Sequence, residues 1–254
     1  MLLLIIITRI ISLNFYMFPT RISKALSKLG VCSRREAENL ILQRKIKINN
    51  VLITSPVNFV DLHDVIHVDN ILVSKTIKKI RLWKYYKPTG VITSHRDNFN
   101  RTTLFQLLPK SIGRVISVGR LDYNTEGLIL LTNNGNLSRK LELPSTYLSR
   151  IYLCRAYGNM PRCMVDELSK GITVDNINYA PMLVERYKKQ GANSWYTIKL
   201  YEGKNNEIRK VFGYFSLQVN RLIRTHYADF SLDNMSPKTI MEISYQKFKK
   251  FCES

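Results

Sequence analysis

The stretch GRLDYNTEGLILLTNNG, residues 119–135, decides the fold because it joins a glycine-bounded loop to a long apolar run. Residues 128–132 are continuously apolar or β-branched and predict a buried strand, which the turn residues 133–135 end. Asp122 therefore lies on a loop that leads into a core strand. Loops held by a rigid scaffold often carry chemistry, but an aspartate that caps its own turn is an equally good interpretation of this segment alone.

Further strands surround this stretch on both sides. LWKYYKPTGVITS at 82–94 predicts a strand before it, and SRIYLCRAYG at 149–158 and VNRLIRTHY at 219–227 predict two strands after it. KLYEGKNNEIRKVFGYF at 199–215 passes from a strand through a polar turn into a helix. Because strands and helices mix without a regular alternation, we predict an α+β domain with a mixed, largely antiparallel sheet for residues 81–254.

Two of these segments carry candidate functional side chains. Alternation places Arg150 and Tyr152 on one face of their strand, although a tyrosine in a strand is more often a core residue. The helix that follows the polar turn carries Arg209 and Lys210. Cations outnumber carboxylates in both segments, so they point to a negatively charged partner.

The composition also favours a polyanionic partner. The chain has 254 residues, with 39 lysines and arginines against 19 acidic residues, a formal charge of +20 and a pI near 9.9. Such a charge favours nucleic acid, because binding releases counterions from the phosphates. An anionic membrane surface or an acidic protein is the alternative that charge alone leaves open.

The sequence predicts no metal centre. The four cysteines form no CxxC pair, and among the histidines only His63 and His67 have a spacing that ligands could use. A histidine pair in so polar a stretch is most often a solvated surface feature. Unpaired cysteines suit a reducing cytosol, so we expect a cytoplasmic protein, with an organelle as the alternative compartment.

The chain begins with an apolar extension, residues 1–18. Its first part, MLLLIIITRIISLNFY, is too short to span a bilayer and is interrupted by Arg9. It also lacks the basic lead-in and the small-residue cleavage site of a secretory signal. We therefore expect no membrane partner and take Met17 as the candidate native start.

Residues 19–73 predict a small module of two helices and a hairpin. Residues 22–29 repeat apolar side chains at helical spacing, and Gly30 follows where a left-handed cap is needed. Residues 33–36, SRRE, match a capping box that starts a second helix, and KIKINNVLI at 45–53 alternates around an Asn-Asn turn. The cations beside these elements form either an RNA-binding patch or an ordinary solvated face: Arg34, Arg35, Arg44 and Lys45.

The run RISKALSKLGVCSRREAENLILQRKIKINNVLI, followed by HDVIHVDNILV, resembles the αL RNA-binding module of small-subunit ribosomal protein S-four and its relatives. The resemblance covers residues 19–73. It implies that the paired arginines of the second helix and the hairpin follow an RNA backbone. Residues 74–80, SKTIKKI, are then a short basic linker to the second module.

Behind that module, KPTGVITS, GRLDYNTEGLILLTNNG, RIYLCRAYG and EGKNNEIRKVF follow in an order that is similar to the RsuA/RluB family of ribosomal RNA pseudouridine synthases. The resemblance covers residues 19–243. It implies that residues 81–254 form a pseudouridine synthase catalytic domain. It further implies an enzyme that isomerises a chosen uridine of folded ribosomal RNA to its carbon-linked isomer without a cofactor.

The resemblance places the catalytic aspartate at Asp122, the base-stacking tyrosine at Tyr152 and the cation that pairs with the aspartate at Arg209. One carboxylate is enough for an internal rearrangement, because no water enters and no leaving group departs for good. The carboxylate either attacks the anomeric carbon or removes the neighbouring sugar proton, and the sequence leaves both routes open. A nearby arginine favours the charged form of a carboxylate in a drying pocket.

Basic residues of both modules are expected to hold the RNA, chiefly through its phosphates, while Tyr152 supports a flipped base. The expected RNA-binding residues are Arg34, Arg35, Arg44, Lys45, Lys87, Arg120, Arg150, Lys204 and Lys210. Among them, Arg120 is expected to help flip or replace the base. Arg150 stands where the family usually has a lysine, which keeps the charge but changes the donor geometry.

The expected substrate is large-subunit ribosomal RNA or a pre-ribosomal particle, because YYKPTGVITSHRDNFNRTTLFQLLP and VGRLDYNTEGLILLTNNG resemble the RluB branch. Small-subunit ribosomal RNA is the alternative within the same class. From another class, the alternative is a catalytically inert RNA-binding protein of ribosome assembly. A monomer is expected, since no dimer seam is visible in the sequence.

Overall fold

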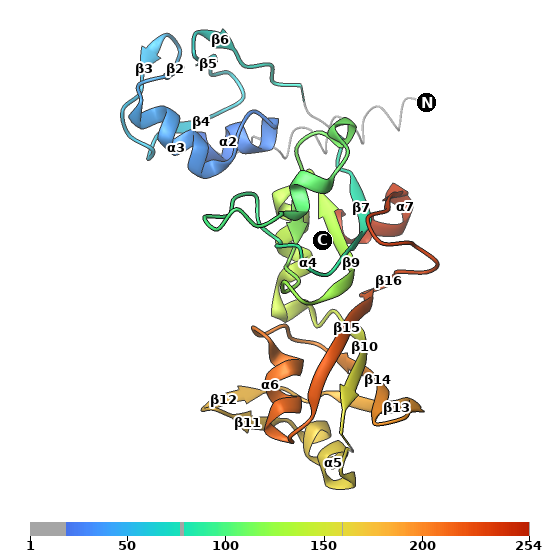
Figure 1. Ribbon diagram of the computed structural model, residues 1–254. Helices are drawn as coiled ribbons and strands as arrows, with labels where there is room; N and C mark the ends of the chain where they lie inside the picture. The colour runs from blue at the N-terminus through green and yellow to red at the C-terminus, as the bar shows by residue number, and fades with distance from the viewer. Residues whose placement is uncertain (1–18, 77–78, 159, 254) are drawn as a thin grey trace. The chain divides into compact units, whose positions relative to one another are not determined.

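The computed structural model describes residues 19–76, 79–158 and 160–253 (Figure 1). The chain divides into two compact units, unit 1 within residues 1–80 and unit 2 within residues 81–254. The predicted apolar extension, residues 1–18, lies outside the described residues. Among the described helices, none has the length and apolarity needed to cross a bilayer.

Unit 1 has the two helices and the hairpin that its sequence predicts. Gly30 caps the first helix with a φ of 76°, and Ser33 and Glu36 form the reciprocal capping box of the second. The hairpin turns at Asn49 and Asn50, both with positive φ. Apolar faces of both helices and the small sheets enclose one core. The elements are β1 (Thr20–Arg21), α2 (Ile22–Leu29), α3 (Arg34–Leu42), β2 (Ile46–Ile48), β3 (Val51–Leu52), β4 (Phe59–Val60), β5 (Ile66–Val68) and β6 (Ile71–Leu72).

Unit 2 is built on a mixed nine-stranded sheet, which confirms the predicted α+β class. The order is β13-β14-β10-β15-β9-β7-β17, with β16 paired to β15 and β8 paired to β9. All pairs are antiparallel except β15 with β9. The strands are β7 (Leu82–Lys87), β8 (Ile116–Val118), β9 (Glu126–Thr132), β10 (Arg150–Tyr157), β13 (Leu183–Gln190), β14 (Asn193–Leu200), β15 (Gln218–Tyr227), β16 (Phe230–Ser231) and β17 (Ile240–Ile243).

The predicted central strand is β9, and every one of its residues is buried. It pairs with β7, β8 and β15, so its continuous apolar run is covered by sheet neighbours and by packing on both faces. The turn after β9 leads directly into α4 (Gly135–Glu142), a helix that the sequence analysis misses. Asn134 caps it by accepting from the backbone N–H groups of Asn136 and Leu137.

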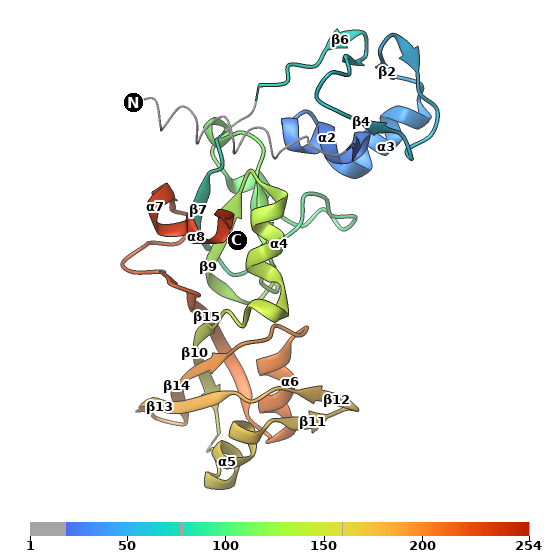
Figure 2. The same ribbon diagram turned by 180° about the vertical axis from the view of Figure 1, so that it is seen from behind.

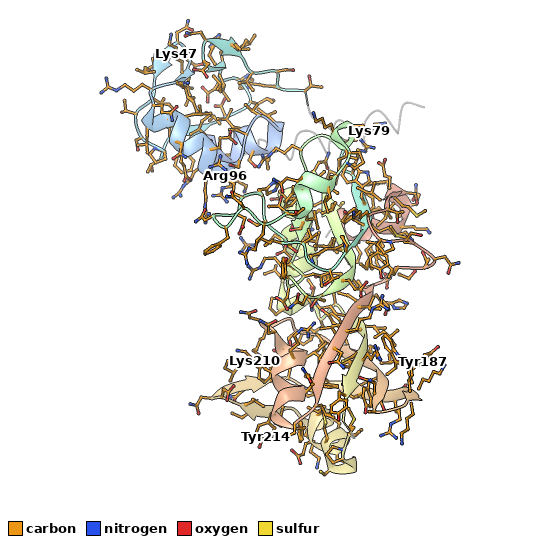
Figure 3. The ribbon with its side chains drawn as sticks, viewed as in Figure 1. Lys47, Lys79, Arg96, Tyr187, Lys210 and Tyr214 are labelled. Atoms are coloured by element: carbon orange, nitrogen blue, oxygen red, sulfur yellow. The ribbon has the colours of Figure 1, made fainter. Side chains whose placement is uncertain are left out.

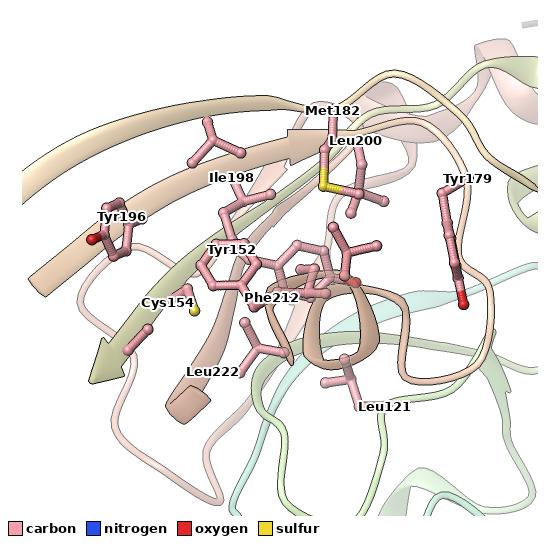
Figure 4. Close-up of a cluster of buried hydrophobic side chains, with 14 of the residues drawn as sticks. Leu121, Tyr152, Cys154, Tyr179, Met182, Tyr196, Ile198, Leu200, Phe212 and Leu222 are labelled. Carbon is pink, nitrogen blue, oxygen red and sulfur yellow. The ribbon is translucent and has the colours of Figure 1, made fainter. Parts of the chain in front are cut away.

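Helices α5 (Arg162–Lys170) and α6 (Glu207–Tyr214) pack on one face of β10 and β14. Figure 2 shows α6 beside β15 and the hairpin of β11 (Ile172–Val174) and β12 (Ile177–Tyr179). In the core, Tyr152 and Cys154 of β10 meet Phe212 of α6 (Figure 4). The remaining helical segments are η1 (Leu104–Leu107), η2 (Lys110–Ile112), η3 (Pro144–Thr146), α7 (Tyr245–Phe248) and α8 (Lys250–Glu253).

Candidate active site

A cavity of about 450 Å³ lies in unit 2 where four distant chain segments meet. The loop after β8 brings Asp122, the start of β10 brings Tyr152, the N-terminal turn of α6 brings Arg209, and the end of β15 brings Arg224. The structure therefore brings together the three residues to which the sequence analysis gives catalytic roles. Cations and carboxylates alternate with apolar side chains around the cavity wall.

The loop that carries Asp122 is held in place by the side chain of Lys87. Lys87 Nζ donates to the carbonyl oxygens of Asp122 at 3.0 Å and Thr125 at 2.8 Å, and to that of Pro88 at 3.2 Å. The Asp122 carboxylate, in contrast, forms no hydrogen bond or ion pair with any residue that the structure describes. The backbone of Asp122 is therefore fixed, and the residue lines the cavity.

The position of Lys87 corrects its predicted role as an RNA contact. Its side chain is fully buried, so RNA cannot reach it. Burial lowers the pKa of Lys87 to about 8, while the nearby negative charge of Asp122 acts in the opposite direction. Lys87 is a positioning residue for the loop and not part of an RNA surface.

Tyr152 combines the two roles that the sequence leaves open. Its side chain is only 9% exposed and belongs to the apolar core, where it lies beside Phe212 and Leu222 (Figure 4). The same residue also lines the cavity. A tyrosine held rigidly by a core on one side, with the cavity on the other, is suited to stack on a planar base.

Arg209 approaches the aspartate loop through the backbone. Its Nη1 donates to the Val219 carbonyl at 2.8 Å and its Nη2 to the Asn124 carbonyl at 2.9 Å. The predicted ion pair with Asp122 is absent from the ion pairs of the described residues. Instead, Arg209 holds the loop two residues beyond the aspartate, and its Nε is buried without a hydrogen-bond partner.

The side chain of Arg150 forms hydrogen bonds within the protein. Its guanidinium is 8% exposed and donates to the carbonyl of Tyr201 at 2.7 Å and to the hydroxyl of Tyr227 at 3.2 Å. Arg224, which the sequence analysis does not assign, also lies against Tyr227: the guanidinium carbons of Arg150 and Arg224 are each 5.0 Å from the centroid of its ring. Arg150 also lines the cavity, so its contact with RNA stays a prediction.

The turn before α6 contributes a carboxyl pair that the sequence analysis also misses. Glu207 is 4% exposed and accepts from the backbone N–H of Lys204 at 3.0 Å. Burial, and then the neighbouring charge of Glu202, raise the pKa of Glu207 to about 8. Glu202 itself is ion-paired with Lys204, an exposed residue at the cavity rim. The raised pKa favours the uncharged form of Glu207 in the cavity wall.

The other predicted RNA-binding residues lie at the surface of their own units. In unit 1, Arg34, Arg35, Arg44 and Lys45 are all exposed, and Lys45 is 3.4 Å from Asp69. In unit 2, Arg120 is exposed at the cavity, and Lys210 is partly exposed on α6 (Figure 3). These positions agree with RNA contact but do not test it.

Within the described part of the chain, no group of three or more histidine, cysteine, aspartate or glutamate side chains could hold a metal ion. The residues that line the cavity are suited to hydrogen bonding, base stacking and nucleophilic or general-base attack by one carboxylate.

Comparisons with known proteins agree with this chemistry. The model of the RNA pseudouridylate synthase family matches residues 81–214, and that of the S4 domain matches residues 20–66. A Rickettsia bellii protein named uncharacterized RNA pseudouridine synthase is 47% identical, over 90% of this chain and 99% of its own length. A Salmonella typhi protein named ribosomal large subunit pseudouridine synthase B is 34% identical, over 86% of this chain and 77% of its own. A crystal structure of a pseudouridylate synthase shares the fold, with a TM-score of 0.64, 21% identity and coverage of 91% and 99% of the two chains.

Proposed function

The chain belongs to the RNA pseudouridylate synthase family, and on that premise we propose that it isomerises a uridine of large-subunit ribosomal RNA to pseudouridine. The family predicted from the motifs is confirmed, and the chain is an RNA pseudouridine synthase, an isomerase. Two features support ribosomal RNA as the substrate: the S4 domain and the relatives named for the ribosomal large subunit. The proposed compartment is the cytoplasm, and the proposed working form is a monomer.

The observation that carries this proposal is the convergence of Asp122, Tyr152 and Arg209 on one cavity. These residues come from a loop, a strand and a helix that are far apart in the sequence. One cavity combines a fixed loop, a rigid aromatic side chain and a carboxylate without a described partner. This combination supports a working catalytic site rather than a vestigial one.

In the proposed reaction, the N1–C1′ bond of the target uridine breaks and a C5–C1′ bond forms. Asp122 either attacks C1′ as a nucleophile or removes the proton from C2′. The detached uracil turns while its plane lies against Tyr152, and C5 then bonds to C1′. On the first route this step displaces the Asp122 carboxylate from C1′, and on the second it adds C5 across the C1′=C2′ double bond while Asp122 returns the proton to C2′. The C5 proton is lost to solvent and N1 gains one, so atoms and charge balance without a cofactor.

The cations have separate tasks in this scheme. Arg209 fixes the loop next to Asp122 and adds positive charge to the cavity wall. Arg120 is exposed at the cavity, which supports the proposal that it fills the space that the flipped nucleotide leaves in the RNA. Site choice rests on RNA shape and on phosphate contacts of unit 1.

The test compares the wild type with Asp122→Asn and with a matched control, Asp175→Asn, which changes an exposed aspartate in the β11–β12 turn. Each protein is incubated with protein-free large- and small-subunit ribosomal RNA, and pseudouridine is mapped by carbodiimide adduct and primer extension. We expect one new stop in large-subunit RNA with the wild type and the control, and none with Asp122→Asn. A stop in small-subunit RNA alone would reassign the substrate, and a stop with Asp122→Asn would refute the catalytic role.

A further inference from the structure

The sheet of unit 2 has a second face that the cavity does not use. Along β10 and β14, buried residues alternate with partly exposed ones. The buried set packs against α5 and α6 and includes Tyr152, the cavity residue of β10. Because successive side chains point to opposite sides of a strand, Arg155 and Trp195 belong to the opposite face, which we call the outer face.

Four residues form one row across the outer face. Lys188 of β13 is directly opposite Trp195 of β14, Trp195 is opposite Arg155 of β10, and Arg155 is opposite Arg221 of β15. Directly opposed residues in antiparallel strands point to the same side, with their Cβ atoms roughly 4.5–5.5 Å apart. The row is therefore a continuous line of three cations and one indole across four strands.

The row carries more positive charge than the protein balances. Arg221 pairs with Glu126 at 2.6 Å, but Lys188 and Arg155 have no carboxylate partner among the described residues. Arg155 Nε is also buried without a hydrogen-bond partner. Like charges on neighbouring strands destabilise a sheet, so this arrangement has a cost that an anionic ligand would offset.

Exposed aromatic rings accompany the cations. Tyr157, two residues along β10 from Arg155 and therefore on the same face, is 53% exposed, and Trp195 is partly exposed. The Trp195 indole N–H donates to the Gln190 side chain at 3.1 Å, which fixes the ring in place. Fixed aromatic rings between cations are the combination with which proteins hold single-stranded nucleic acid.

The outer face is also separated from the helices that flank the cavity. The buried side chains of β10 and β14 pack with those of α5 and α6, so the outer face is the side of these strands that points away from both helices. A ligand on the outer face can thus be bound together with a nucleotide in the cavity.

We propose that the outer face binds a single-stranded segment of the RNA substrate outside the modified uridine. Phosphates lie against Lys188 and Arg155, and unpaired bases stack on Trp195 and Tyr157. The proposal rests on the proposed function only in taking RNA as the ligand. A protein partner is less suited to the surface, because an acidic peptide would use the cations but not the exposed rings.

The test uses full-length Lys188→Gln/Arg155→Gln and a matched control, Lys247→Gln/Lys249→Gln, which removes two exposed cations from the C-terminal segment of the same unit. Filter binding to a protein-free large-subunit ribosomal RNA transcript is measured from about 50 to about 200 mM salt. We expect the outer-face variant to bind about tenfold more weakly and to lose about 1.4 from the slope of log K against log salt, as two single-strand phosphate contacts require. The control should stay within about twofold of the wild type.

Arg155 is partly buried, so a second variant guards against a folding defect. Lys188→Gln/Tyr157→Thr changes only exposed side chains and should also weaken binding, with the melting temperature unchanged. If both outer-face variants bind RNA as the wild type does, or if the control loses as much affinity as they do, the proposal is overturned. Failure of the proposed function looks different, because the wild type would then bind RNA but form no pseudouridine.

Discussion

At the scale of single residues, the site depends on a buried lysine beneath its aspartate. Lys87 donates to three carbonyl oxygens, two of them in the segment from Asp122 to Thr125. We expect Lys87→Met to lower kcat by about tenfold or more, because removing the donor leaves buried carbonyls unsatisfied and frees the loop. RNA affinity should stay within about twofold. Single-turnover kinetics and filter binding measure the two quantities, with exposed Lys110→Met as the control.

Lys87 also predicts how stability depends on pH. Its pKa is lowered in the folded state from 10.5 to about 8, so between these values the unfolded state binds more protons than the folded state. Stability therefore rises with pH. The cost of burying the charge is fully present below about pH 8 and disappears as the pH rises from about 8 to 10.5. Relative to Lys87→Met, the wild type should gain roughly 2 kcal/mol between about pH 7 and pH 10. Urea unfolding at each pH tests this, and a flat difference would contradict the buried charge.

The residues that the sequence places correctly are those with a strong local pattern. Asp122 precedes an apolar strand, and its place in the loop follows from that run. Lys87 is misassigned as an RNA contact, and Arg150 is more deeply buried than its charge suggests, because the sequence of a strand shows that a residue is cationic but not how deeply it lies. Their burial depends on carbonyl acceptors that come from elsewhere in the chain, such as Tyr201 for Arg150. No pattern along one strand contains that information.

At the scale of elements, the parallel contact between β9 and β15 brings Asp122 and Arg224 to the same cavity. Gly127 faces Arg224 in this pairing, with a φ of 108°. A Cβ atom at Gly127 would lie 2.4 Å from the Arg224 carbonyl oxygen, a backbone atom that cannot move aside cheaply. We expect Gly127→Ala to destabilise unit 2 by about 3 kcal/mol or more and to abolish activity.

Gly213 in α6 is the matched control, because a Cβ atom there meets nothing within 4 Å. Gly213→Ala should stabilise the helix by about 0.5–1 kcal/mol. Thermal unfolding separates the two alanine variants by sign. If Gly127→Ala melted at the wild-type temperature, the close contact of β9 with β15 would be wrong.

The strands and helices themselves are largely predictable from the sequence, whereas the order in which the strands pair is not. The strands β7, β9, β10 and β15 and the helix α6 follow from alternation and turn signals, because those depend on residues close in sequence. The order of strands in the sheet depends on contacts between distant segments. The cavity is a product of that order, and so the motifs indicate candidate catalytic residues but not how the fold holds them.

At the scale of the whole molecule, unit 1 and unit 2 each have a hydrophobic core of their own. The core of unit 1 and the core of unit 2 share no residues. Each unit therefore has its own set of buried apolar side chains. The charge of +20 then acts on both units as a common attraction for RNA, which salt weakens.

This division predicts that unit 1 sets RNA affinity and leaves the chemistry alone. Arg34 and Arg35 are exposed at the start of α3, where the capping box of Ser33 and Glu36 holds the helix without them. We expect Arg34→Gln/Arg35→Gln to raise KM for ribosomal RNA about tenfold and to lower the salt slope by about 1.4–1.8, as loss of two phosphate contacts requires.

The same variant should keep the wild-type kcat at saturating RNA, because the groups around Asp122 belong to the other core. Steady-state kinetics at several salt concentrations measure both constants, and Glu38→Gln, a change of opposite sign on the same helix, should shift KM the other way. If kcat fell while KM stayed constant, the arginines would act on the bound uridine itself. The prediction that unit 1 affects only RNA affinity would then be wrong.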